Sequence, residues 1–166
     1  MLMALSIHTF VAELRYNPFG TMERTLKVGD LPTGTLRDRL LVEKLSYRFR
    51  PPQRNDLVVF KAPPALQVQN LHDDMIKRVV GLPGDVVQVR NGQILINGKV
   101  IVEPYVKEKP AYNCGPITVP QHQYFVLGDN RNRSYDSHLW ELVPEQNIIG
   151  HAILRIYSFG YFDLEY

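Results

Sequence analysis

The sequence predicts a mostly β fold, built from packed antiparallel sheets or a partly open barrel. Twelve prolines and eleven glycines interrupt its 166 residues at short intervals. Short runs rich in β-branched and aromatic residues lie between these breaks, a pattern that favours strands over long helices. Two Asn-Gly pairs, at residues 91–92 and 97–98, tolerate the positive φ angles of tight hairpins. With 45% hydrophobic residues, a chain of this length is expected to form one domain.

Seven segments have the length and composition of strands. In chain order they are residues 57–61, 75–80, 86–90, 93–96, 99–102, 124–127 and 148–157. The Asn-Gly pairs separate the third, fourth and fifth of these segments, so residues 86–102 are predicted to form a three-stranded meander. We interpret this meander as scaffold.

Two further segments are ambiguous. Residues 39–48 (RLLVEKLSYR) alternate poorly between apolar and polar positions, and they fit either a strand or a short helix. Residues 61–74 contain prolines and fit a loop or an insertion.

An apolar segment at residues 1–14 precedes the β-rich domain expected over residues 15–166. As a helix it would be about 20 Å long, against roughly 30 Å of hydrocarbon in a bilayer. We interpret it as the remnant of a membrane anchor, with a buried core helix or a signal-peptide core as alternatives. Near the other end, four aromatic residues fit either a membrane interface or a last core strand: Tyr157, Phe159, Tyr161 and Phe162.

Charge and cysteine content exclude several classes of function. Nineteen basic and seventeen acidic residues give a net charge of +2 without a basic, aromatic-rich stripe, which argues against nucleic acid as a partner. Cys114 is the single cysteine, so an intrachain disulfide and a cysteine-based zinc or redox centre are excluded. His72 precedes Asp73 and Asp74 but lacks a second histidine at metal-ligand spacing. We expect a solvated loop there, and no metal or cofactor.

Lys77 stands out because it begins an apolar run. Strand alternation places it on one face with Met75 and Val79, while Arg78 points to the other face. We expect Lys77 to be half-buried. Since burial disfavours the charged form, its amine can be neutral near physiological pH and accept a proton from a hydroxyl. The alternative is a structural lysine whose stem packs on the sheet while its ammonium group reaches water.

Four segments resemble signatures of the type I signal peptidase family, in the family's order. Two of them match letter for letter: residues 77–85 (KRVVGLPGD) and the Gly-Asp-Asn-x-x-x-Ser-x-Asp-Ser block within residues 128–138 (GDNRNRSYDSH). Residues 54–60 (RNDLVVF) resemble the family's Arg-Gly-Asp-Ile-Val-Val-Phe strand, and residues 18–26 (PFGTMERTL) resemble the segment of its nucleophile. The resemblance covers nearly the whole chain.

This resemblance implies an activity and a location. The family's catalytic domain is mostly β, lies on the outer (trans) face of a membrane and cleaves signal peptides from exported precursor proteins. For this chain we therefore expect signal peptides and membrane lipid as partners, and the plasma or thylakoid membrane as location.

Carried over by position, the resemblance also implies roles for individual residues. Lys77 is the general base, and Ser134 hydrogen-bonds its amine to orient it. Two ion pairs brace the site, one between Arg78 and Asp129. The other joins Asp136 to residue 138, where this chain has His138 and many relatives have arginine. Met22 is expected to contact substrate.

The nucleophile segment departs from the family pattern. Thr21 stands where the family has its serine, Arg24 where it has a proline, and Phe19 where it often has a hydroxyl residue. The branched carbon of threonine restricts χ1 and crowds the attacking oxygen. Loss of one oxyanion donor costs roughly 100- to 1000-fold in rate, so the sequence predicts a slow enzyme. Thr33 and Thr35 are alternative hydroxyls, but neither is followed by methionine.

Three functions follow from these observations. The first is an endopeptidase that cleaves signal peptides with Thr21 and Lys77. The second is a catalytically impaired homologue that binds signal peptides or other extended peptides without cleaving them. A self-cleaving regulator with a related serine/lysine fold ranks last, because the sequence shows neither a DNA-binding segment nor an Ala-Gly cleavage loop.

Overall fold

The chain forms two antiparallel β-sheets. The structure is a computed structural model, and it describes residues 12–16, 22, 39–71, 73–140, 142–156 and 162–163. The large sheet has the spatial order β1 (Ala12–Tyr16), β2 (Arg39–Glu43), β11 (Ile148–Ile156), β3 (Leu57–Phe60), β4 (Met75–Gly81), β9 (Gln123–Leu127) and β10 (Val143–Pro144), with β12 (Phe162–Asp163) paired to β11. The small sheet has the order β7 (Lys99–Val100), β6 (Gln93–Ile96), β5 (Val86–Arg90) and β8 (Cys114–Thr118). Packed antiparallel sheets are therefore confirmed, and neither sheet closes into a barrel.

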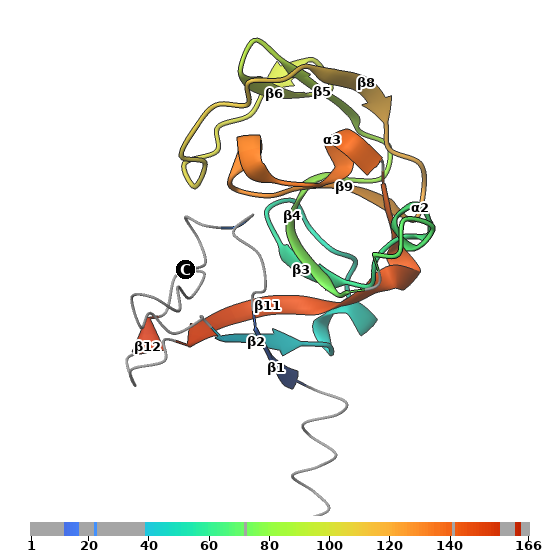
Figure 1. Cartoon of the computed structure of the whole chain (residues 1–166), viewed down its shortest axis with the longest axis vertical. Coiled ribbons are helices and arrows are strands. Elements are labelled where there is room, and N and C mark those ends of the chain that lie inside the picture. The colour runs from blue at the N-terminus through green and yellow to red at the C-terminus, as the bar shows by residue number, and fades with distance from the viewer. Residues whose placement is uncertain are drawn as a thin grey trace, which may run out of the picture.

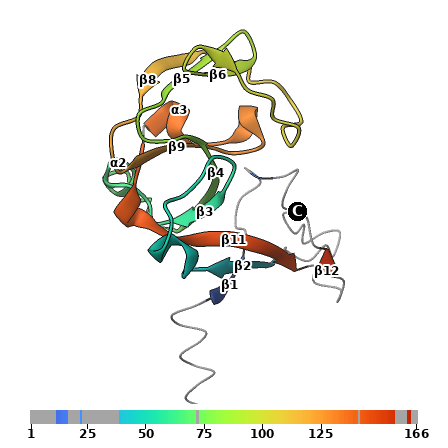
Figure 2. The same ribbon diagram turned by 180° about the vertical axis from the view of Figure 1, so that it is seen from behind.

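The large sheet is strongly curved. In Figure 1 it runs from β1, β2 and β11 at the bottom, through β3 and β4, to β9, and the small sheet lies above it. Figure 2, from behind, shows the same order, with α3 (Ser137–Trp140) between β9 and the small sheet in both views. Strands β4 and β9 thus lie in the middle of the molecule.

Among the residues that the structure describes, the helical elements are short. Besides α3 they are α2 (Pro64–Gln67) and the 3-10 turns η2 (Ser46–Arg48), η3 (Arg131–Arg133) and η4 (Glu145–Asn147). In the described part of the chain, none has the length and apolar character that a membrane crossing requires. Helix α2 lies in the segment predicted as a loop, where Pro64 fits the first turn because its missing N–H needs no partner there.

The seven predicted strands are all present, with ends that differ from the prediction by at most two residues. Strands β1, β8 and β10 were not predicted, whereas β12 includes Phe162 of the aromatic segment for which a last strand was one alternative. Residues 39–48 turn out to contain a strand followed by a 3-10 turn, β2 and η2. A helix over residues 1–14 is wrong for residues 12–14, which belong to β1 and pair with β2.

The predicted meander is confirmed as β5, β6 and β7. Both connecting turns have positive φ at their two central residues, with 52° and 71° at Asn91 and Gly92, and 52° and 77° at Asn97 and Gly98. These angles match the right-handed twist of the flanking strands. The small sheet is completed by β8, which pairs with β5.

Strands β4 and β9 are buried on both faces. On one face Val79 packs with Val126, and on the other Val80 packs with Leu127. A Cβ atom on Gly81 would lie 2.5 Å from Val87 Cγ2, so glycine is required where β4 meets the small sheet. A side chain in this region therefore sits in the core whichever way it points.

Candidate active site

Lys77 lies on β4 with 2% of its surface exposed, and it is more deeply buried than the sequence indicated. Its Nζ donates a hydrogen bond to Ser134 Oγ at 3.0 Å. The alternative of a structural lysine whose ammonium group reaches water is therefore wrong. The expectation of half-burial fails because Lys77 shares its face of β4 with Val79, and that face is covered by a core cluster that includes Leu66 of α2 and Trp140 of α3.

Burial changes the acid–base behaviour of Lys77. Desolvation lowers the pKa of its amine from 10.5 to about 8, while the carboxylates of Asp136 and Asp129 act in the opposite direction. A substantial fraction of the amine is thus neutral in mildly alkaline solution. A neutral amine with a hydrogen-bonded serine beside it can accept a proton from a hydroxyl group.

Arg78 points to the opposite side of β4 and forms a buried ion pair with Asp129. Its Nε lies 2.8 Å from Asp129 Oδ1 and its Nη2 lies 2.6 Å from Asp129 Oδ2, so the pair is bidentate. The Arg78 guanidinium also donates to the Asn55 carbonyl at 3.0 Å and lies 3.9 Å from the Tyr105 ring centroid. These contacts hold the turn after β9 against β4.

Asp136 and His138 also lie in contact. Nδ1 of His138 is 2.6 Å from Asp136 Oδ1, and the Asp136 side chain has no exposed surface. The other carboxylate oxygen, Oδ2, accepts a hydrogen bond from the Gly128 amide at 2.9 Å. Asp136 therefore ties the segment that carries Ser134 to the end of β9.

Met22 connects the nucleophile segment to this arrangement. The Asp129 amide donates to Met22 Sδ at 3.4 Å, and the Met22 side chain has no exposed surface. It packs in a core cluster that includes Val59 and Ile76. Contact between Met22 and substrate stays a prediction.

Several residues named for the nucleophile segment lie outside the described residues. They are Phe19, Thr21, Arg24, Thr33 and Thr35. His72 lies outside them as well, whereas its neighbours Asp73 and Asp74 are described. Within the described part of the chain, no three histidine, cysteine or carboxylate side chains converge as metal ligands would.

Three further residues near the site are joined by hydrogen bonds and were not predicted from the sequence: Arg131, Glu103 and Tyr105. Arg131 has 1% of its surface exposed and forms two 2.8 Å bonds with the carboxylate of Glu103. Its Nε also donates to the Gly128 carbonyl at 3.0 Å. Tyr105 donates its hydroxyl to Glu103 or to Asn55 Oδ1. Glu103 and Tyr105 lie in an irregular loop, where no sequence periodicity marks them.

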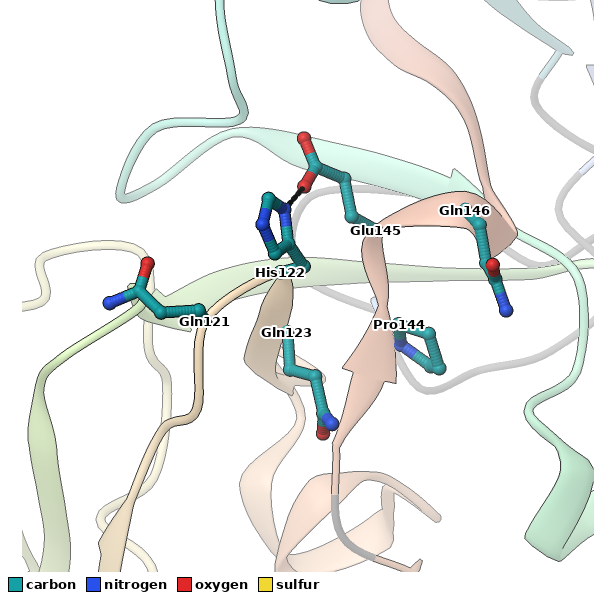
Figure 3. Close-up of a pocket in the computed structure, with 6 residues that line it drawn as sticks. All are labelled: Gln121, His122, Gln123, Pro144, Glu145 and Gln146. Carbon is teal, nitrogen blue, oxygen red and sulfur yellow. Dashed lines mark hydrogen bonds and ion pairs between the residues drawn. The ribbon is translucent and has the colours of Figure 1, made fainter.

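A surface pocket lies away from these residues (Figure 3). It has a volume of about 490 Å³ and is lined by Gln121, His122, Gln123, Pro144, Glu145 and Gln146. Nδ1 of His122 is 2.7 Å from Glu145 Oε2 in an exposed pair. Gln123 begins β9, whereas Leu127 at its other end pairs with Arg78. The pocket is therefore separate from the candidate active site.

Comparison with known proteins supports one family. A model of the family described as signal peptidase, peptidase S26, matches residues 1–157. The chain is 51% identical over 159 residues to a signal peptidase I of Leptolyngbya laminosa, which covers 95% of this chain and 74% of that protein. It is 46% identical over 127 residues to a probable thylakoidal processing peptidase 2, chloroplastic, of Arabidopsis thaliana, covering 75% of this chain and 35% of that protein.

A solved structure agrees with these matches. The signal peptidase I of Enterococcus faecalis V583 aligns with a TM-score of 0.52 and 31% sequence identity, covering 61% of this chain and 97% of that one. The fold and the matches define a hydrolase of the peptidase class. The chain belongs to the signal peptidase family, peptidase S26.

Proposed function

We propose that this protein is an endopeptidase that cleaves signal peptides from exported precursor proteins, with the Thr21 hydroxyl as nucleophile and Lys77 as general base. The observation that carries the proposal is the buried Lys77 amine, 3.0 Å from Ser134 Oγ, on the inner strand of the large sheet. The bond from the Asp129 amide to Met22 Sδ supports it, because Met22 directly follows Thr21 and Asp129 follows the end of β9.

The proposed reaction begins with proton transfer from Thr21 Oγ to the neutral Lys77 amine. Oγ attacks the carbonyl carbon of the scissile peptide bond, and the backbone N–H of Thr21 donates to the oxyanion. The carbon–nitrogen bond then breaks, and the Lys77 ammonium returns its proton to the leaving amine. Water, deprotonated by Lys77, finally hydrolyses the ester and restores the hydroxyl.

The supporting residues act through position and charge. Ser134 accepts a hydrogen bond from the Lys77 amine, which fixes its direction. The Arg78–Asp129 pair and the Asp136–His138 pair hold the two ends of the segment that carries Ser134. Met22 is proposed to contact substrate beside the nucleophile. Substrate binds as an extended peptide along strand edges near the site, with small pockets selecting its side chains.

The proposed location is the outer (trans) face of a plasma or thylakoid membrane. Residues 1–14 are proposed to contact membrane lipid. A plant relative named as a thylakoidal processing peptidase supports the thylakoid as one such membrane. The small net charge of +2 supports a protein partner rather than nucleic acid.

Incubation with a precursor that carries a signal peptide tests this function. Wild type, Thr21→Ser, Thr21→Ala and Lys77→Ala are compared for release of the mature protein. Cleavage by wild type that disappears in both alanine variants is expected, because each removes one half of the reacting pair. Cleavage by Thr21→Ser and by none of the others would instead identify an impaired homologue that binds peptides.

A further inference from the structure

The charge of the His138 ring is set by one of its two nitrogens, Nε2. The His138 amide and Nδ1 lie 3.3 Å and 2.6 Å from Asp136 Oδ1, and a carboxylate accepts hydrogen bonds but has none to donate. Nδ1 therefore carries a proton, and its N–H group donates a hydrogen bond to Asp136 Oδ1. The charge of the imidazole ring then depends on whether Nε2 is protonated as well.

Asp136 links this ring to the base. It lies two residues after Ser134, whose Oγ accepts the hydrogen bond from Lys77. Burial lowers the pKa of Lys77, and the Asp136 carboxylate is the main charge that opposes this effect. A change in the net charge of the Asp136–His138 pair therefore changes the attraction that the Lys77 ammonium experiences.

The His138 ring is held in place by stacking. The ring centroids of Tyr112 and His138 are 3.9 Å apart, with 13° between their planes. Tyr112 lies in the loop between β7 and β8, which the bidentate pair of Glu103 and Arg131 fastens to the turn after β9. The imidazole thus keeps its orientation toward Asp136 in either charge state.

The other titratable groups around His138 stay neutral near physiological pH. Within the described residues these are the Tyr112 hydroxyl and, on β8, the Cys114 thiol, whose Sγ lies 3.9 Å from the His138 carbonyl. Burial raises the pKa of both groups. Arg131, which lies near Tyr112, is paired with Glu103. Asp136 and Lys77 are therefore the charges through which His138 acts.

We propose that His138 is a positioning residue whose protonation at Nε2 adjusts the Lys77 base through Asp136. A charged ring makes the pair neutral overall, so the Lys77 ammonium releases its proton more readily. When the His138 ring is neutral, the negative charge of Asp136 is uncompensated and attracts the Lys77 ammonium, which therefore keeps its proton to higher pH. The two protonation equilibria are therefore coupled through Asp136, and Lys77 deprotonates over a wider pH range than an isolated amine.

Side-chain NMR titration of Lys77, labelled with 13C at Cε, tests the inference. Wild type is compared with His138→Arg, which keeps a fixed positive charge, and His138→Gln, which keeps a neutral hydrogen-bond donor. We expect the Lys77 midpoint to be lowest in His138→Arg and highest in His138→Gln, with a separation of about one pH unit. The wild-type curve should be the broadest. Tyr112→Phe is the matched control, because it keeps the stacked ring and should leave the curve unchanged.

The inference rests on the proposed function for its catalytic consequence, whereas the NMR titration requires no turnover. If the wild-type protein cleaves no precursor, the proposed function is wrong. The Lys77 titration can still be measured in that case, so the two failures are distinguishable. Lys77 curves that coincide in His138→Arg and His138→Gln, or that appear in the reverse order, overturn the inference. Thermal unfolding of each variant shows whether the comparison is made on folded protein.

Discussion

Lys77 Nζ and Ser134 Oγ lie 3.0 Å apart although their residues are separated by 57 positions in the sequence. Lys77 comes from β4 and Ser134 from the segment that follows η3. Both side chains are buried, so the hydrogen bond is protected from competition by water. This relationship leads to two predictions about catalysis and one about stability.

Activity is expected to rise with pH. Burial lowers the pKa of Lys77 to about 8, and in the proposed reaction its amine must be neutral to accept a proton from Thr21. The ratio kcat/KM should therefore increase as the pH rises toward about 8 and then level off. Rates of precursor cleavage between pH 6 and 10 test this. A profile that falls through this range would exclude Lys77 as the base.

Removal of the Ser134 hydroxyl is expected to slow the reaction. In the proposed reaction the Lys77 amine becomes an ammonium, and a hydrogen bond to a charged group contributes about 1.5–3 kcal/mol. Ser134→Ala should therefore lower kcat/KM by about 10- to 100-fold. Ser137→Ala is the matched control, since the buried Ser137 hydroxyl accepts from the Val126 amide at 3.0 Å. Equal losses of activity in both variants would contradict the proposed contact.

Lys77→Met should increase stability at neutral pH while abolishing cleavage. The pKa of Lys77 is 10.5 ordinarily and about 8 in the fold, so between these values the unfolded chain binds a proton that the folded chain lacks. Burial of the charged amine therefore destabilises the fold below about pH 8, by on the order of 3 kcal/mol. This penalty disappears as the pH rises to about 10.5.

Denaturant unfolding of wild type and Lys77→Met at pH 7 and pH 10.5 measures this effect. The difference in the free energy of unfolding between Lys77→Met and wild type should be large at pH 7 and small at pH 10.5. Lys99→Met, at an exposed position of β7, is the control and should show no such closing gap. A gap of constant size would mean that the charge of Lys77 carries no penalty.

The Arg78–Asp129 pair is expected to be important for stability. Removing one member of a buried ion pair leaves an uncompensated charge, which costs about 3–5 kcal/mol. Arg78→Ala and Asp129→Ala should each lower the free energy of unfolding by about this amount, measured with denaturant. The exposed pair of His122 and Glu145 provides the comparison, where His122→Ala should cost less than about 1 kcal/mol. Similar losses in all three variants would contradict this prediction.

Much of the scaffold was predictable because its signals are local. The meander follows from two Asn-Gly turns, and both have the expected positive φ angles. Strand β8 gave no such signal, because Gly115 and Pro116 lie inside it and break the usual strand composition. Strand β1 was missed because the apolar pattern of residues 1–14 fits a helix by length, whereas pairing with β2 decides the conformation of its last residues.

The candidate site was predictable where residues fall in family signatures. Lys77, Arg78, Asp129 and Ser134 were named from the sequence, and the structure brings them together. The depth of Lys77 was not predictable, since it depends on packing contacts with residues far away in the chain, such as Ser134. The stacking of Tyr112 on His138 was missed for the same reason.

The position of Lys77 on a strand buried on both faces has a consequence for thermal inactivation. Central strands usually open only when the whole domain unfolds, whereas loops open more readily. The amide of Lys77 should therefore be among the slowest to exchange with deuterium. The proposed base then has no separate melting transition, and it loses its geometry at the temperature at which the whole domain unfolds.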